Sequence, residues 1–395
     1  MLRNFGRQLA SFGFVLALAG IVAASATAGA SAQAIKTVAE EAILIEGSTG
    51  AVLFEKEADT QMPPSSMSKL MTVYLAFEKL KDGVITPQDE FEVSEPTYRK
   101  WRLQGSTMFL NAGDRVTVHD LLLGIIVQSG NDACVVLAES LAGSEEIFVE
   151  WMNAKAKELG MNNSHFTNVN GWPDEDHYMT ARDLATLTQA MIANFPEYYP
   201  MFAERNFTYA GIPQSNRNPI LYSMEEADGL KTGHTEAGGY GLTASAVKGG
   251  RRLILVLNGM SSEKVRARES ERLLTFGFRN FDIYPLLKAG QVLDKANVWL
   301  GETDQVSLVI ENDVTLSLSK QARRKMKAKV VYDGPIQAPI VKGQPIATLE
   351  ITSSDMKTIT LPLVAGENIS ELGGFSRLKA AFNYMLIGSS GQGDD

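Results

Sequence analysis

Three short peptides contain the residue types that acyl transfer at a serine requires. They are Ser66-Met67-Ser68-Lys69, Ser129-Gly130-Asn131 and Lys231-Thr232-Gly233. The first contains a hydroxyl and an amine that can act as its base, because a serine hydroxyl is a weak nucleophile until its proton is removed. The second contributes a hydroxyl and an amide, and the third a cation. Together they predict a nucleophile, a base, a proton relay and an anion-binding group.

The Ser-x-x-Lys pattern is a weak signal alone, because it begins at six serines of this chain. These are Ser66, Ser245, Ser261, Ser317, Ser354 and Ser376. Only Ser66 follows a proline break and opens a strongly apolar segment, so we expect a helix over about 66–79. Residues three apart share one face of a helix, which brings the side chains of Ser66 and Lys69 together. Ser66 would also lie at the helix N-terminus, where developing negative charge is stabilised.

The other two peptides each occur once. Ser129 to Asn131 interrupt an apolar segment, 117–142, which predicts two helices joined by a buried turn. A hydroxyl and an amide are costly to bury unless they are hydrogen-bonded. We expect Thr117 to cap the first helix and Asp132 the second. Lys231-Thr232-Gly233 leads towards predicted strands over 240–247 and 252–257, and the glycine would let a ligand backbone approach closely.

This combination resembles the motifs of serine β-lactamases and penicillin-binding proteins. Over about 39–372 the chain is similar to the low-molecular-mass D-alanyl-D-alanine carboxypeptidases of bacteria, most specifically at 66–72, 128–134 and 228–235. The resemblance implies an α+β fold: a β-lactamase/DD-peptidase-like domain, with helices around an antiparallel sheet, and then a small all-β domain. It implies a peptidoglycan stem peptide as substrate, β-lactam antibiotics as inhibitors, and no cofactor or metal.

We expect Ser66 to be the nucleophile and Lys69 its base. A lysine can act as a base only when neutral, and burial beside a second cation, for which Lys231 is the candidate, would lower its pKa. Ser129 would pass a proton to the departing amine. The backbone N–H of Ser66 is one candidate donor to the oxyanion, and the resemblance implies the N–H of His234 as the other.

Substrate binding is expected from the remaining groups of the three peptides. Asn131 would hold the substrate amide. Lys231 and Thr232, with Arg217, would bind the terminal carboxylate, because a cation-lined pocket selects an anionic C-terminus. No G-x-S-x-G or H-E-x-x-H pattern is present, so neither a Ser-His-Asp nor a metal hydrolase is supported.

Two other functions remain open at this stage. A serine β-lactamase would need a carboxylate for the deacylating water. Glu158 falls in a loosely lactamase-like stretch, but we interpret it as a solvated helix residue. The middle motif is also Ser-Gly-Asn, where lactamases favour Ser-Asp-Asn. Alternatively, the protein could be an envelope scaffold with vestigial activity, whose contact patch is the basic run within 323–329; such a run is more often a solvated surface.

The N-terminus predicts export. Arg3 and Arg7 precede an apolar run, and small residues follow at 30–32, so we expect a signal peptide over 1–32. An uncleaved anchor, or cleavage at 32–34, are the alternatives. The net charge of -9 argues against nucleic acid as a partner. The single cysteine, Cys134, excludes an internal disulfide and is expected to be buried.

We expect a catalytic domain over 35–281, with further helices over 145–159, 180–194 and 262–279. A hairpin is expected from strands over 42–45 and 52–54. A β domain over 282–372 is predicted from six short strand patterns, at 298–300, 306–310, 314–318, 329–332, 346–351 and 358–361. The end of the chain, 373–395, contains an amphipathic segment from Phe375 to Ile387. It would lie on the outer face of the inner membrane, facing the periplasm, or pack on its own domain.

Overall fold

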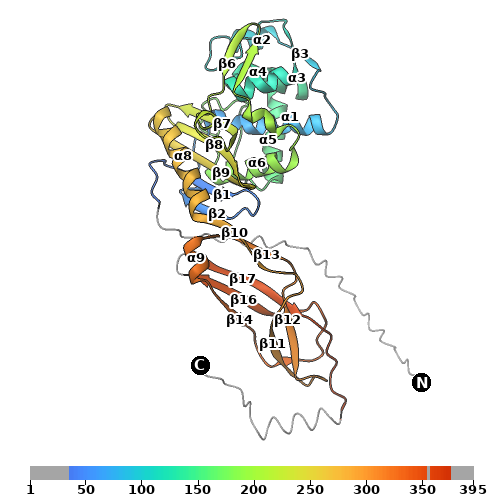
Figure 1. Cartoon of the computed structure of the whole chain (residues 1–395). Helices are drawn as coiled ribbons and strands as arrows, with labels where there is room; N and C mark the ends of the chain where they lie inside the picture. Colours follow the sequence, from blue (N-terminus) through green and yellow to red (C-terminus); the bar gives the residue numbers. More distant parts are fainter. Residues whose placement is uncertain (1–34, 354–355, 375–395) are drawn as a thin grey trace, which may run out of the picture.

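The computed structural model describes residues 35–353 and 356–374 (Figure 1). The predicted signal peptide, 1–32, and the predicted amphipathic segment, 375–387, lie outside these ranges. The described residues form two domains, of which the first combines helices with a sheet and the second consists mostly of strands. The α+β class and the two-domain order expected from the sequence are confirmed. The limits proposed for each domain stay a prediction.

An antiparallel five-stranded sheet organises the first domain, in the order β2-β1-β9-β8-β7. Its strands are β1 (Ala42–Glu46), β2 (Val52–Lys56), β7 (Ala227–Thr235), β8 (Gly239–Lys248) and β9 (Arg251–Met260). Both the hairpin and the pairing of β8 with β9 agree with the sequence prediction. β7 is an edge strand of this sheet, so the third peptide lies on a strand edge.

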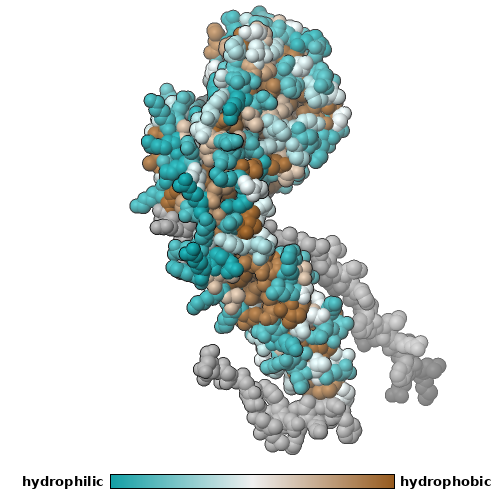
Figure 2. Space-filling view, viewed as in Figure 1, coloured by the Kyte–Doolittle hydropathy of each residue, from teal (hydrophilic) through white to brown (hydrophobic). Residues whose placement is uncertain are grey.

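Both faces of the sheet pack against a hydrophobic core. Alternate residues of β9 point to opposite faces, so they belong to different cores. Ile254 and Val256 join the large core, which also contains the helices of the first two motif peptides. Leu253 and Leu255 join a second core on the other face, beneath α8 (Glu263–Asn280). The solvent side of α8 is hydrophilic (Figure 2).

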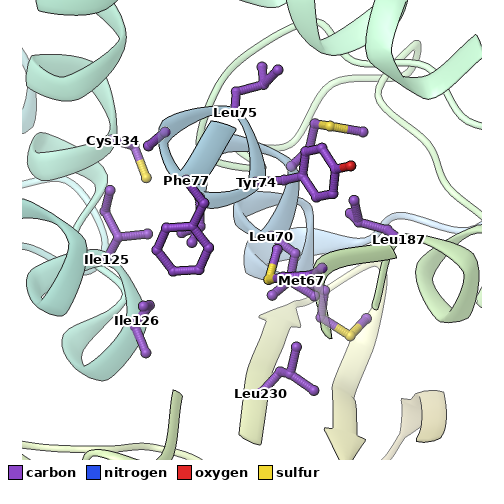
Figure 3. Close-up of a cluster of buried hydrophobic side chains, with 14 of the residues drawn as sticks. Met67, Leu70, Tyr74, Leu75, Phe77, Ile125, Ile126, Cys134, Leu187 and Leu230 are labelled. Carbon is purple, nitrogen blue, oxygen red and sulfur yellow. The ribbon is translucent and has the colours of Figure 1, made fainter. Parts of the chain in front are cut away.

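The large core surrounds the helix that follows the first peptide (Figure 3). This helix, α1 (Lys69–Lys81), has Leu70 and Phe77 buried among side chains of neighbouring helices and of β7, including Leu230. The neighbouring elements are α3 (Val118–Leu123), a π-helical turn η2 (Gly124–Gln128), α4 (Asn131–Ala142), α5 (Glu145–Glu158) and α6 (Ala181–Asn194). Cys134 is buried here, as expected.

Two local predictions need correction. Ser66 does not lie in the first turn of the α-helix but in a preceding 3₁₀ turn, η1 (Ser65–Ser68). Asp132 does not cap α4, whose N-cap is Gly130 without a side-chain bond. The Asp132 carboxylate is buried and instead accepts hydrogen bonds from the Met108 N–H, at 2.9 Å, and the Leu110 N–H, at 3.3 Å. The Asp132 carboxylate therefore binds backbone N–H groups of a loop that is distant in the sequence, and it does not serve as the N-cap of α4. Thr117 does cap α3.

Shorter elements complete the first domain, and sequence periodicity did not reveal them. They are α2 (Glu95–Trp101), α7 (Ile220–Ser223), η3 (Tyr199–Ala203), the hairpin of β3 (Glu90–Glu92) with β4 (Arg115–Thr117), and the hairpin of β5 (Asn206–Tyr209) with β6 (Ile212–Ser215).

The second domain has its own core and a six-stranded sheet in the order β14-β16-β17-β12-β11-β15. These strands are β11 (Val292–Trp299), β12 (Gln305–Val309), β14 (Lys327–Val331), β15 (Ile336–Gln337), β16 (Pro345–Ser353) and β17 (Met356–Ala365). A separate pair joins β10 (Phe281–Leu287) to β13 (Val314–Ser319). The sequence analysis missed β10, β15 and the helix α9 (Lys320–Lys325), which contains part of the basic run.

The two domains meet through β10. Phe281, its first residue, is buried in the core beneath α8. Its carbonyl accepts a hydrogen bond from Arg251, at 2.7 Å, and Arg251 also pairs with the buried Glu46, at 2.6 Å. Thr49 in the β1–β2 turn and Ser317 on β13 are hydrogen-bonded at 2.8 Å. The Ser-x-x-Lys copy at Ser317 therefore belongs to this interdomain contact.

Candidate active site

Ser66 and Lys69 form the centre of the site. Lys69 Nζ lies 2.8 Å from Ser66 Oγ and also donates to the carbonyl of Asn170. The lysine side chain is 0% exposed. The 3₁₀ turn, which follows Pro63-Pro64, turns the serine towards the amine. At this distance an uncharged Lys69 can accept the hydroxyl proton directly.

The loop opposite α1 holds this pair in place. Thr72 Oγ1 donates to the carbonyl of Val169 at 2.6 Å, and Lys69 binds the next carbonyl along the chain. Gly171 follows with φ +75°, and a Cβ there would lie 2.0 Å from the Ser65 carbonyl oxygen. Only glycine permits this close approach. Sequence reasoning missed the Val169–Gly171 contact, since nothing in the pattern of that segment marks a partner of Lys69.

Burial lowers the pKa of Lys69 to about 8, because the charged ammonium is disfavoured away from water. The nearby Arg217 guanidinium lowers this pKa further. The direction agrees with the sequence prediction: Arg217 lowers the pKa of Lys69, and Lys69 and Lys231 also repel one another. Burial also lowers the pKa of Lys231 well below its usual range, with Lys69 and Arg217 as the next causes. A substantial neutral fraction of Lys69 at pH 7 to 8 follows from a pKa of about 8.

Ser129 joins the second peptide to the third. It ends the π-helical turn in a left-handed conformation, φ 67° and ψ 33°, which is uncommon for a residue with a side chain. Lys231 Nζ donates to Ser129 Oγ at 2.9 Å and to the Thr232 carbonyl at 3.3 Å. Lys231 is 2% exposed. A buried lysine thus lies against each of the two serines.

Asn131 lies beside the same turn and is tied to the 102–114 loop. Its Nδ2 donates to the Gln104 carbonyl at 3.2 Å, and its backbone N–H to the Ser106 carbonyl at 2.8 Å. Asp132 holds the next part of that loop through the bonds described above. The sequence marked Asp132 only as a cap, because the distant loop that it binds could not be inferred.

Two arginines lie within electrostatic reach of the buried lysines. Arg217 lowers the pKa of both, and its side chain donates to Ser106 Oγ at 2.5 Å. Arg266, on α8, lowers the pKa of Lys231. It was not predicted as a site residue, since the sequence around it indicates only a charged helix. His234 is exposed at the end of β7, with its ring stacked on Tyr240 at 3.9 Å between centroids. The guanidinium of Arg266 lies 5.7 Å from the Tyr240 ring centroid.

Comparison with known proteins decides the family. Residues 27–262 match the D-alanyl-D-alanine carboxypeptidase family of peptidases, and residues 281–371 match the penicillin-binding protein 5 C-terminal domain. The chain belongs to the D-alanyl-D-alanine carboxypeptidase family. It is therefore a serine-type hydrolase of that class, as the sequence predicted, and the alternative functions are not favoured.

Individual relatives cover most of this carboxypeptidase. D-alanyl-D-alanine carboxypeptidase DacD of Escherichia coli K12 is 38% identical over 347 residues, which are 87% of this chain and 89% of the relative. DacA of the same organism is 38% identical over 86% of each chain. The crystal structure of penicillin-binding protein 5 from Haemophilus influenzae matches with a TM-score of 0.74 at 34% identity, covering 86% of this chain and all of that one.

A shorter neighbour has a bound antibiotic. Penicillin-binding protein D2 from Listeria monocytogenes, solved in its ampicillin-bound form, is 28% identical with a TM-score of 0.57. It covers 62% of the carboxypeptidase chain and 100% of its own.

The remaining sequence predictions concern residues away from the site. Glu158 ends α5 and pairs with Lys155 at 2.6 Å, with 66% of its side chain exposed, as expected of a solvated helix residue. The basic run divides between α9 and the exposed edge strand β14. Within the described ranges of this carboxypeptidase, none of the helices has both the length and the apolar character needed to cross a bilayer.

Proposed function

We propose that this carboxypeptidase removes the terminal D-alanine from peptidoglycan pentapeptides through an acyl-enzyme on Ser66. The observation that carries the assignment is the 2.8 Å contact between Ser66 Oγ and the buried Lys69 Nζ. Neutral Lys69 takes the hydroxyl proton as Oγ attacks the carbonyl of the penultimate D-alanine. The backbone N–H groups of Ser66 and His234 stabilise the resulting oxyanion.

Collapse of this intermediate breaks the peptide bond. Ser129 passes a proton to the departing D-alanine amine, and the adjacent Lys231 supports that transfer, given the 2.9 Å contact between them. Water then attacks the Ser66 ester, releases the shortened peptide and restores the hydroxyl. The protons balance over the cycle: the proton that Lys69 takes from Ser66 makes up for the one that Ser129 gives to the amine, and the attacking water supplies the proton that restores the Ser66 hydroxyl.

The exopeptidase specificity arises from the cations around the leaving group. Lys231, Thr232 and Arg217 bind the terminal carboxylate, and Asn131 binds the substrate amide. An internal peptide bond lacks this carboxylate and loses those charge-assisted bonds. A β-lactam carries both an acyl group and a carboxylate, so it acylates Ser66 in the same orientation. The ampicillin complex of the Listeria relative supports this inhibition.

We further propose that the enzyme acts on the cell wall from the periplasm and contributes to cell shape. Residues 1–32 would direct export, and Phe375 to Ile387 would attach the mature chain to the outer face of the inner membrane. The apolar run of the N-terminus and the helical spacing of apolar residues near the C-terminus support this location.

Mass spectrometry of the penicillin-treated protein tests the function. We expect one added penicilloyl group, on the peptide that contains Ser66, and persistence of this adduct for minutes. D-alanine should be released from a pentapeptide in a parallel assay. An adduct on another serine, or turnover of the adduct in well under a second, would contradict the proposal.

A further inference from the structure

Six exposed cations cluster on the second domain within ten positions of the chain. They lie on the helix α9 and on the edge strand β14 that follows it. We call this cluster the basic patch, and it consists of Lys320, Arg323, Arg324, Lys325, Lys327 and Lys329. The proposed mechanism uses none of these residues. The patch is a local excess of positive charge in a chain whose net charge is -9.

The charge of the basic patch is not neutralised by neighbouring residues. None of the six cations forms an ion pair with a carboxylate within residues 35–353 and 356–374. Exposed cations elsewhere do form such pairs: Lys248, 60% exposed, pairs with Glu226 at 2.6 Å. Glu350 lies opposite Lys329 in the register of β14 and β16, but no ion pair joins them. The six cations are therefore free to bind an external anion.

Structural roles account for only part of the basic patch. Lysines on a free edge strand hinder pairing with other chains, which suits Lys327 and Lys329. Cations in the last turn of α9 interact favourably with the helix dipole. Lys320, however, begins α9, where a cation is unfavourable, and it lies three and four positions before two arginines, where like charges repel. An arrangement that works against the helix in this way indicates a role in binding.

The basic patch lies at the junction of the two domains, at one end of α8. Its helix α9 begins directly after Ser319, which pairs with Phe281, the residue that follows α8. Figure 1 shows α9 at the end of the second domain that faces the catalytic domain. Near the other end of α8, Arg266 lies within electrostatic range of Lys231. The 18 residues of α8 span about 27 Å between the active site and the patch.

The chemistry of the patch suits a polymer that carries carboxylates at many points. Ammonium and guanidinium groups bind carboxylates through charge-assisted hydrogen bonds. In the proposed function each stem peptide ends in a carboxylate, and one peptidoglycan strand carries many stem peptides. A strand with one peptide in the active site therefore has further carboxylates that can reach the patch. Contacts at this second place raise the effective concentration of the strand at the active site.

The path of the C-terminus argues against a lipid surface as the ligand of the patch. The Leu372 N–H donates to the Leu300 carbonyl at 2.9 Å, directly after β11. Three strands of the sheet separate β11 from β14, which places them about 19 Å apart at about 4.8 Å per strand. A membrane attached through the residues that follow Leu372 therefore lies nearer to the β11 side of the domain than to the patch.

We propose that the basic patch is an exosite for the carboxylates of the peptidoglycan strand, and that it holds this polymer while the active site shortens one of its stem peptides. The exosite rests on the proposed function, because the polymer that it binds is the substrate assigned there. An extended pentapeptide spans at most about 18 Å, which is less than the length of α8. A free pentapeptide in the active site therefore cannot reach the patch, and only the polymer benefits from it.

A matched pair of triple variants of the full chain tests the exosite. The patch variant is Lys320→Gln/Lys325→Gln/Lys327→Gln. The control variant removes three other exposed lysines and is Lys157→Gln/Lys295→Gln/Lys342→Gln. The measurement is kcat/KM for D-alanine release from a soluble pentapeptide and from peptidoglycan strands without cross-links. We expect the patch variant to lose about 3- to 30-fold on the strands, the range for three exposed charge pairs, and to keep its rate on the pentapeptide.

The control variant should match the wild-type protein on both substrates. The difference between the two variants should shrink at high salt, which screens exposed charges. Equal rates of the two variants on the strands would overturn the exosite, while D-alanine release upholds the proposed function. Release from neither substrate by the wild-type protein would overturn both. A loss that is equally large on the pentapeptide would also overturn the exosite, because the substitutions would then have damaged the active site.

Co-sedimentation with phosphatidylglycerol vesicles tests the lipid alternative. The patch variant and the control variant should bind these vesicles equally, because the patch does not serve membrane attachment. If the patch variant alone loses vesicle binding and keeps its rate on peptidoglycan strands, the ligand of the patch is lipid and the exosite is overturned.

Discussion

The ammonium group of Lys231 lies 2.9 Å from the hydroxyl of Ser129, across 102 positions of the chain. This contact joins the second and third motif peptides into one unit on the edge of β7. Together with the Ser66-Lys69 pair, it yields two serine-lysine pairs with both amines buried. Such an arrangement supports proton transfer in two places: at the attacking hydroxyl and at the leaving amine.

Replacement of the nucleophile should abolish the chemistry. We expect Ser66→Ala to lower kcat/KM for D-alanine release by about 10³-fold or more, since no other group can form the acyl-enzyme. Penicillin labelling should disappear as well. The control is Ser261→Ala, which alters the first residue of another Ser-x-x-Lys copy at an exposed position and should leave both readouts intact. Residual labelling of Ser66→Ala at the wild-type rate would refute the assignment.

The rate of acylation should depend on the protonation of Lys69. Burial lowers the pKa of this lysine to about 8, and only the neutral amine can accept a proton. The rate of penicilloylation, measured by stopped flow, should therefore rise with pH through about 8 and level off above it. Lys69→Arg should eliminate the reaction, because arginine stays protonated in proteins.

A half-buried lysine outside the site provides the comparison for this pH profile. Lys155 pairs with Glu78, at 2.8 Å, and with Glu158. Lys155→Met should leave the profile unaltered. An acylation rate that does not change with pH between about 6 and about 9 would show that Lys69 is not the base.

Loss of the Ser129 hydroxyl should slow proton delivery to the leaving amine, while Ser66 can still be acylated. We expect Ser129→Ala to reduce kcat/KM for the peptide by about 10²- to 10⁴-fold, the usual range for a general acid or base. Acylation by penicillin should still place its adduct on Ser66. Ser129→Ala activity within a factor of about two of wild type would exclude a relay role, because that loss lies far below this range.

Asp132 should matter for the stability of the loop beside the site. Its buried carboxylate binds backbone N–H groups of the loop that also binds Asn131. Hydrogen bonds to a charged group contribute about 1.5–3 kcal/mol each, so Asp132→Asn should lower the free energy of unfolding by about that amount. Urea denaturation measures the change. The same substitution at the exposed Asp82 is the control, and equal stability losses in the two variants would contradict the anchoring role.

Much of the fold followed from local patterns. The Val52–Lys56 hairpin strand, the capped start of α3 and the long charged helix α8 were all predicted, because periodicity and turn residues act over a few positions. The β3–β4 and β5–β6 hairpins escaped prediction, since each strand has only three or four residues. Asp132 was assigned to the wrong partner because its hydrogen bonds reach a loop more than twenty positions away.

The amino-acid sequence alone determined the types of group in the site, their order and the family that they indicate. Side-chain chemistry and short-range spacing are properties of the chain itself. Only the tertiary structure decided that Lys69 is wholly buried, that Arg266 lies within electrostatic range of Lys231, and that Lys231 is hydrogen-bonded to Ser129. Burial and electrostatic contact depend on which distant segments pack together, and the lowered pKa of Lys69 is a consequence of that packing.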